Sequence, residues 1–216
     1  MHRILSLVLL CTASVNAWAQ TPLSASVEAG DVVFQASRSS QSVAVSAATG
    51  SPYTHMGVIE WVKGKPMVVE AVGPVKRTPL QRWVRRGVDG HVVVKRLRAR
   101  ERLLTPSNLA RMGRVAKRFM GTPYDGLFQW GHKALYCSEL VYLVYLGGAG
   151  ISLGEIQRVG DLNLAPESVR RLIKKRLGAR LDHSEPIITP ASIFADPRLT
   201  TVYSNTPPST AIAPVR

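Results

Sequence analysis

Tyr-Cys-Ser-Glu-Leu-Val, residues 136–141, opens an apolar segment that runs to Leu146 and is followed by Gly147-Gly148. This pattern predicts a buried helix over residues 137–146 that begins at Cys137 and that the two glycines end. Unpaired backbone amides at a helix N-terminus stabilise negative charge, and a thiol is nucleophilic only as the thiolate. The same amides could hold an oxyanion. The pattern therefore favours a catalytic cysteine over a cysteine buried as a small apolar side chain, which composition alone leaves open.

A catalytic thiolate needs a base, and the sequence after residue 19 contains four histidines. His132 and His183 lie in polar segments, and His91 stands at the start of a strand between basic residues. His55 differs because it begins the apolar run Thr-His-Met-Gly-Val-Ile, residues 54–59. An imidazole in such a strand must have polar partners. His55 is therefore the candidate base.

Glu70 is the only charged residue in the strand-like run 67–72, where an unpaired carboxylate would be costly to bury. If Lys63-Gly64 is a two-residue hairpin turn, Gly57 faces Glu70. His55 is then on the same face as Glu70 and diagonal to it, within reach of a long side chain. A three-residue turn would place the two on opposite faces. The hairpin thus predicts a His–Glu pair, which either orients a catalytic imidazole or is a structural buried pair.

The other segments alternate between short strands and helices, without an internal repeat. This order predicts an α+β fold in which an antiparallel sheet packs against helices. The expected strands are residues 32–34, 55–62, 67–72 and 91–97, with a final extended element at 187–194, and the expected helices are residues 37–49, 78–86, 105–120 and 166–177.

The N-terminal residues 1–19 have the features of a cleaved signal peptide. A positively charged start precedes an apolar run over residues 4–15, which ends at Ala-Trp-Ala before Gln20. The run is shorter than the roughly 20 residues that a membrane-spanning helix needs. We therefore expect an exported protein of the periplasm or cell envelope; a retained anchor or a lipid on Cys11 is the alternative. The expected domain is 20–200, with a flexible tail over 201–216.

Removal of the signal peptide would leave a single cysteine and an excess of positive charge. The whole chain has 28 Lys and Arg against 14 Asp and Glu, a net charge of +14. Because residues 1–19 contain one Arg and no acid, the mature value would be 27 − 14 = +13. The cations concentrate in residues 76–118 and 170–180. In an exported protein this favours anionic lipid headgroups or acidic wall polymers over nucleic acid, and a surface charged only for solubility is the alternative.

Five stretches together resemble a known family, the permuted papain-like amidases of the YaeF/YiiX type within the NlpC/P60 superfamily. These stretches are residues 30–34, 49–58, 69–76, 121–125 and 136–141. The resemblance extends from Gly30 to about Asp196 and implies a circularly permuted papain-like (NlpC/P60) fold, in which His and Glu precede Cys in the chain. On this match Cys137 corresponds to the nucleophile, His55 to its base and Glu70 to the orienting acid. Tyr53 and Tyr124 match aromatic positions near the cleft.

The resemblance implies a cysteine hydrolase that cleaves an amide or peptide bond through a thioester. The expected substrate is cell-envelope material, either a cell-wall peptide or a lipid-linked amide. No cofactor or metal is expected, because one cysteine and scattered histidines lack metal-ligand spacing. A lipid acyltransferase or phospholipase of the lecithin:retinol acyltransferase type is one alternative, and a binding module without turnover is another.

Overall fold

The computed structural model describes residues 22–205 except 132, 177, 179 and 180, and a six-stranded antiparallel sheet is its central element. The strand order is β4-β3-β2-β1-β5-β8, and β6 and β7 form a separate antiparallel pair. The strands are β1 Val32–Gln35, β2 His55–Val62, β3 Lys65–Ala71, β4 Val75–Pro79, β5 Val93–Leu97, β6 Gln157–Arg158, β7 Pro186–Ile187 and β8 Leu199–Ser204.

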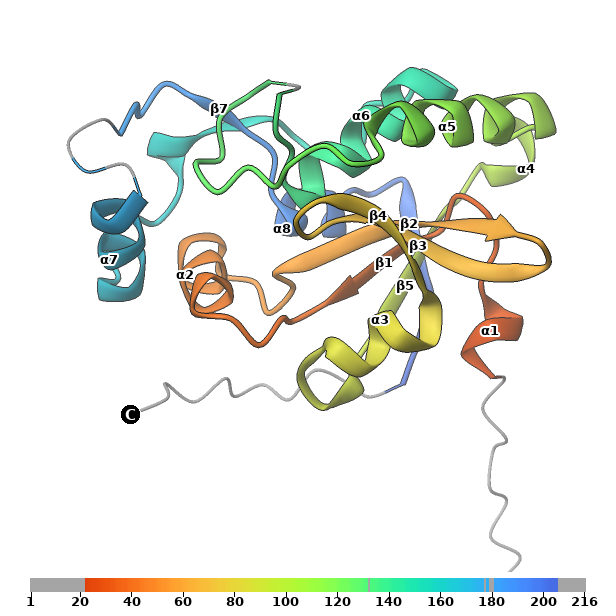
Figure 1. The fold of residues 1–216 in the computed structure, drawn as a ribbon, viewed down its shortest axis with the longest axis horizontal. Helices are drawn as coiled ribbons and strands as arrows, with labels where there is room; N and C mark the ends of the chain where they lie inside the picture. The colour runs from red at the N-terminus through yellow and green to blue at the C-terminus, as the bar shows by residue number, and fades with distance from the viewer. Residues whose placement is uncertain (1–21, 132, 177, 179–180, 206–216) are drawn as a thin grey trace, which may run out of the picture.

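Helices cover both faces of the sheet, which confirms the predicted α+β class. Figure 1 shows α5 and α6 over one face, α1 and α3 over the other, and α2 beside α7 at one end. The helices are α1 Leu23–Ser26, α2 Ser40–Thr49, α3 Leu80–Arg86, α4 Arg100–Leu103, α5 Pro106–Phe119, α6 Cys137–Ala149, α7 Glu167–Arg176 and α8 Pro190–Phe194, with 3-10 turns at Val88–Gly90 and Val159–Asp161. No helix among the described residues is long and apolar enough to cross a membrane.

Apolar side chains alternate along the central strands, so the sheet has a core on each face. In β1, Val32 and Phe34 belong to the larger core beneath α5 and α6, and Val33 belongs to the smaller one. The smaller core contains Trp83 of α3, which is completely buried. Burial on both faces fixes the register of the strands, because a shift by one residue would exchange the two sets of side chains.

The β2–β3 hairpin has the predicted two-residue turn. Lys63 and Gly64 both have positive φ, 50° and 71°, as a type I′ turn requires, and Val62 pairs with Lys65. The register is thereby fixed, and it places His55 and Glu70 on one face of the hairpin, where their side chains bond. This confirms the prediction from the sequence that a two-residue turn places His55 and Glu70 on the same face.

Helix α6 begins at Cys137 as predicted, but Gly147-Gly148 do not end it. The helix continues to Ala149, and Gly150 closes it in the left-handed conformation with φ 70°. Gly148 instead permits close packing: a Cβ there would lie 2.6 Å from the Cα of Met112 in α5. The two glycines therefore lie inside α6 and allow it to pack closely against α5.

Two other segments differ from the predicted elements. The sequence predicts that Thr78 and Pro79 begin a helix, but they end β4, where they pair with β3, and α3 begins at Leu80. The extended element expected over 187–194 is β7 followed by the helix α8. That helix starts because the Thr189 hydroxyl accepts a bond from the Ser192 amide.

The predicted domain end at residue 200 is also wrong. Residues 201–204, assigned to the flexible tail, belong to β8, which pairs with β5 at the edge of the sheet. The rest of the tail from residue 206, and the expected signal peptide with Cys11, lie outside the described residues.

Candidate active site

The three predicted site residues come from three elements that meet at one end of the sheet. Cys137 is the first residue of α6, His55 is the first residue of β2, and Glu70 lies near the end of β3. All three are buried, with exposed fractions of 5, 8 and 0% respectively. The structure therefore brings together residues that are up to 82 positions apart in the chain, from His55 to Cys137.

Hydrogen bonds link these side chains in the order Cys–His–Glu. Nε2 of His55 lies 2.7 Å from Oε2 of Glu70, and the His55 ring also hydrogen-bonds to the Cys137 side chain. Since Nε2 is engaged by the carboxylate, Nδ1 is the ring nitrogen available to the thiol. The geometry is that of a nucleophile, a base and a group that orients the base.

Two residues that sequence reasoning missed complete the site around Glu70. The Thr78 hydroxyl donates to Oε1 at 2.6 Å, and Arg86 donates to Oε1 and Oε2 at 2.5 and 2.6 Å. Burial alone would raise the pKa of Glu70, but the bonds from His55, Arg86 and Thr78 outweigh it and lower the pKa to about 2. The carboxylate is therefore fixed in position and charged.

The environment of His55 favours the imidazolium. Burial lowers the pKa of His55, but the hydrogen bonds to Cys137 and Glu70 have the larger combined effect and raise it to about 9. The Trp83 ring stacks near the imidazole, with centroids 5.9 Å apart and planes at 27°. The ring of His55 is thus held in one orientation by a carboxylate on its edge and an indole on its face.

The start of α6 is anchored to the segment before α8. Ser138 donates to the carbonyl of Ile188 at 2.8 Å, and the Ile188 amide donates to the Tyr136 hydroxyl at 3.2 Å. Tyr136 precedes the helix without making a side-chain capping bond. The amides of the first turn therefore remain available to stabilise negative charge at Cys137.

A cleft with mostly apolar walls opens beside Cys137. Most of its walls come from α2, α7, the start of α6 and the segments 124–128, 159–164 and 181–190. Its apolar lining residues are Ala44, Val45, Ala48, Leu127, Phe128, Val159, Leu162, Leu164, Val169, Leu172, Ile173, Leu181, Ile187, Ile188 and Pro190. The sequence did not mark this cleft, because its walls are contributed by residues from across most of the domain.

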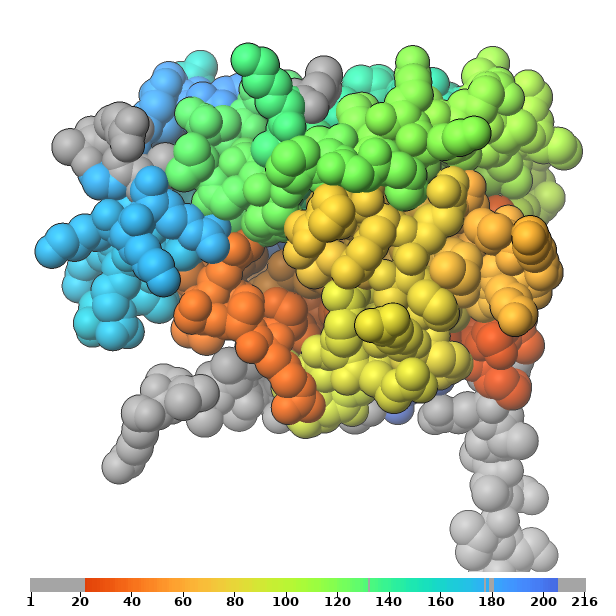
Figure 2. Space-filling view, in the orientation of Figure 1, coloured from red at the N-terminus to blue at the C-terminus, as the bar shows by residue number. Residues whose placement is uncertain are grey.

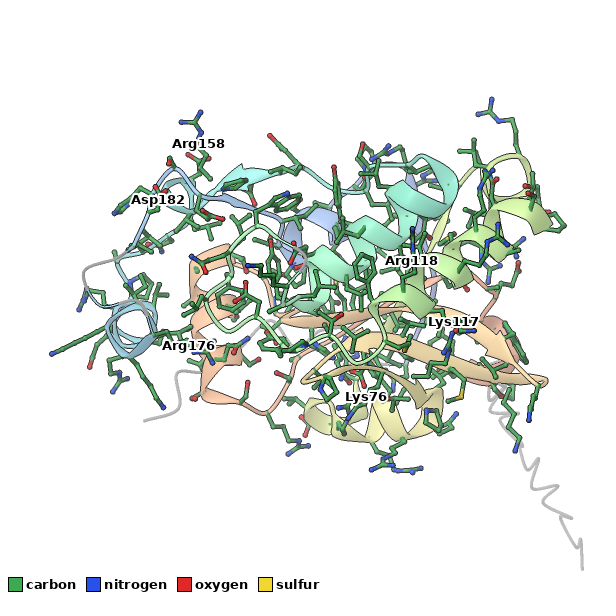
Figure 3. All side chains as sticks on the ribbon, turned by 45° about the horizontal axis from the view of Figure 1, so that its top comes forward. Lys76, Lys117, Arg118, Arg158, Arg176 and Asp182 are labelled. Atoms are coloured by element: carbon green, nitrogen blue, oxygen red, sulfur yellow. The ribbon has the colours of Figure 1, made fainter. Side chains whose placement is uncertain are left out.

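Tyr124 lies in the wall of the cleft as the resemblance implied, whereas Tyr53 does not. The Tyr124 hydroxyl accepts a bond of 2.5 Å from Gln41, whose carbonyl accepts one of 2.8 Å from Arg176. Figure 3 shows Arg176 between α7 and α2. Tyr53 instead stacks on Phe194 in the core, with ring centroids 4.2 Å apart.

The other two described histidines, His91 and His183, take no part in this arrangement. His91 bonds to Asn205 at 3.2 Å, His183 is exposed, and His132 lies outside the described residues. In the part of the chain that the structure describes, no group of three or more His, Cys, Asp or Glu side chains is arranged to hold a metal ion.

Comparisons with known proteins give one consistent result. A family model described as the permuted papain-like amidase enzymes, YaeF/YiiX, C92 family, matches residues 26–203. The uncharacterized protein YiiX of Escherichia coli strain K12 is 38% identical over 206 residues, which cover 95% of this chain and 97% of the relative. A crystal structure of YiiX from Escherichia coli O157:H7, described there as a metalloprotein, is similar with a TM-score of 0.79 and 40% identity, over 83% of this chain and 98% of that one. Among the described residues of this chain, no three or more His, Cys, Asp or Glu side chains are grouped so that they could hold a metal ion.

Proposed function

Because the chain belongs to the YaeF/YiiX family of permuted papain-like amidases and is thus a cysteine hydrolase, we propose that it cleaves the amide bond of a lipid-linked substrate in the cell envelope. Cys137 is the nucleophile, His55 the general acid and base, and Glu70 the residue that orients His55. The observation that carries the choice of substrate is the apolar cleft that opens at Cys137.

The reaction would proceed through a thioester. The Cys137 thiolate attacks the carbonyl carbon, a C–S bond forms, and the carbonyl electron pair moves to oxygen, where first-turn amides of α6 stabilise it. His55 then donates a proton to the amide nitrogen, the C–N bond breaks, and the amine leaves. Next, His55 takes a proton from water, which attacks the thioester and releases the carboxylic acid. The thiolate and the imidazolium are thereby restored.

The walls of the cleft favour an acyl chain over a cell-wall peptide. A wall peptide has charged and hydrogen-bonding groups along its length, and burying these against apolar side chains without partners is unfavourable. An acyl chain gains about 0.8 kcal/mol for each methylene that it buries. An acyl group in the cleft would have its carbonyl carbon near Cys137, which lines the same cleft.

A cell-envelope location agrees with two features of the sequence. Residues 1–19 have the pattern of a signal peptide, and the net charge of +14 suits an anionic surface. Both features support the proposal, and fractionation of cells that produce the full chain would test the location directly. Protein found only in the cytoplasm, with residues 1–19 uncleaved, would contradict it.

Hydrolysis of a series of fluorogenic N-acyl amides tests the substrate class. We expect kcat/KM to rise with acyl length from acetyl to myristoyl, and mass spectrometry to detect an acyl thioester on Cys137. Cys137→Ala is the control and should show neither turnover nor adduct. Preferential cleavage of cell-wall peptides, with no gain from longer acyl chains, would contradict a lipid-linked substrate.

The same apolar cleft also suits an acyltransferase, in which an alcohol or amine resolves the thioester in place of water. Adding a lysolipid or a primary amine to the assay separates the two reactions. If free fatty acid remains the main product, the enzyme is a hydrolase; if acylated acceptor predominates at equal amide consumption, it is a transferase.

A further inference from the structure

Helix α7 has two chemically distinct faces. Arg170, Arg171, Lys174 and Lys175 occupy positions i, i+1, i+4 and i+5, which share one side of an α-helix, and all four are exposed. Within the described chain the only acid paired with them is Glu167, 3.5 Å from Arg171. The outward face of α7 therefore has a net positive charge, since four cations stand against one carboxylate.

The opposite face of α7 forms part of the apolar cleft. Val169, Leu172 and Ile173 line the cleft together with Cys137. Arg176 also turns inward, where it donates to the Gly126 carbonyl at 2.7 Å. The helix thus separates the interior of the cleft from a cationic surface only one helix diameter away.

The loop that Arg176 holds adds an exposed apolar side chain to this region. Leu127 follows Gly126, lines the cleft and is nevertheless 41% exposed. Figure 2 shows α7 at the edge of the molecule beside α2, with side chains that project from the surface. Because Arg176 of α7 bonds to Gly126, both Leu127 and the cations of α7 lie beside the cleft at the same end of the domain.

We propose that the outward face of α7 docks on an anionic lipid bilayer and brings the cleft to the membrane surface. Lys and Arg side chains bind anionic headgroups electrostatically, while apolar side chains enter the boundary between headgroups and acyl chains. A soluble polyanion would use the cations but not Leu127, so the combination selects a bilayer. This surface deepens the proposed function, on which it rests in part, because a lipid-linked substrate is presented from that bilayer.

The second cationic surface lies at the other end of the molecule and provides a matched control. Arg114 and Lys117 are exposed on α5, and the described residues contain no acid that pairs with them. Figure 1 shows α5 and α7 at opposite ends of the longest axis. Removing two charges from either helix changes the net charge equally, so only the position differs.

The test is binding of the full chain to vesicles of phosphatidylcholine, alone or mixed with phosphatidylglycerol. We expect binding only to the mixed vesicles. We expect Lys174→Gln/Lys175→Gln to weaken it by roughly 30-fold, because each cation near an anionic surface contributes roughly fivefold. Arg114→Gln/Lys117→Gln should weaken it less than about threefold. Binding should also fall with added salt.

Three outcomes would overturn the proposal: no binding to phosphatidylglycerol vesicles, equal weakening by the two double variants, or equally tight binding to soluble polyglutamate. Turnover of a water-soluble acetyl amide by Lys174→Gln/Lys175→Gln should equal that of the unmodified protein, because neither lysine contacts the site. If the protein hydrolyses no amide but α7-dependent vesicle binding persists, the proposed function fails and the docking surface stands.

Discussion

Nε2 of His55 lies 2.7 Å from Oε2 of Glu70, and the same carboxylate accepts bonds from Arg86 and Thr78. Glu70 is completely buried, so it is expensive to desolvate and is stabilised only by these donors. The pair can therefore serve orientation, stability or both. The two roles predict different changes in rate and stability when the charge of Glu70 is removed alone and when it is removed together with that of Arg86.

Glu70→Gln should lower kcat by about 10²–10⁴, less than Cys137→Ala, because the amide cannot stabilise the imidazolium. It should also lower the free energy of unfolding by about 2 kcal/mol, since Arg86 loses its carboxylate partner. In Glu70→Gln/Arg86→Gln the stability should largely return while the rate does not. Urea unfolding and steady-state kinetics on the three proteins test this. Recovery of the rate in the double variant would show that Glu70 has a structural role only.

The raised pKa of His55 predicts a loss of stability in alkali. The folded-state value of about 9 exceeds the unfolded value of 6.5, so the His55 contribution is fully present below about pH 6.5 and disappears as the pH rises through 9. The lowered pKa of Glu70 has the opposite sign: its contribution is present above pH 4.5 and disappears as the pH falls toward 2. Urea unfolding as a function of pH measures both.

Two variants identify the groups responsible for the alkaline loss. His55→Gln should remove it, since no titrating ring remains. In Cys137→Ala the loss should occur at lower pH, because the bond to Cys137 is one cause of the raised pKa. An alkaline profile that neither substitution changes would show that other groups determine it.

Local sequence patterns were sufficient to predict the Cys–His–Glu arrangement, because each member stands out against its immediate neighbours. Cys137 begins an apolar helix, and His55 and Glu70 interrupt apolar strands whose two-residue turn fixes their common face. Thr78 and Arg86 could not be found in this way. Residues 76–79 lack the apolar alternation of a strand, and so the sequence predicts that a helix begins at Thr78, within the last two residues of β4.

The cleft was also beyond sequence reasoning, for a topological reason. Its walls join α2 to α7 and to the segment before α8, and over 120 residues separate Ala48 from Ile173 in the chain. An apolar stripe on a helix reads the same whether it faces a core or a cavity. Only the packing of the helices distinguishes the two.

Gly148 makes the packing of α5 on α6 testable. A methyl group there would lie 2.2 Å from the Cγ and 2.6 Å from the Cα of Met112, so the helices would have to separate. Gly148→Ala should therefore cost about 3 kcal/mol of unfolding free energy. Gly147→Ala is the control. A Cβ at Gly147 would lie 3.1 Å from a side-chain carbon of Val115, and the higher helix propensity of Ala offsets this contact, so the free energy of unfolding should change by less than about 1 kcal/mol. If Gly148→Ala and Gly147→Ala were equally stable in urea unfolding, Gly148 would not set the distance between the helices.

Ala48 offers a way to close the cleft without touching the Cys–His–Glu residues. It lies on α2 in the cleft wall, whereas its neighbour Ala47 is not part of the lining. A phenyl ring at Ala48 would occupy the space that we propose for the acyl chain. Each methylene that it displaces would lose about 0.8 kcal/mol of binding free energy. We therefore expect Ala48→Phe to lower kcat/KM for a myristoyl amide by about tenfold or more and to leave that for an acetyl amide nearly unchanged.

Ala47→Phe adds the same ring to the same helix and should change neither rate. Thermal unfolding of both variants shows whether each remains folded at the assay temperature. If Ala48→Phe lowered the rates for both amides equally, the substitution would be acting on the Cys–His–Glu geometry. If Ala48→Phe lowered kcat/KM for neither amide, the acyl chain would not lie against α2. The proposal that the apolar cleft selects the substrate would then be wrong.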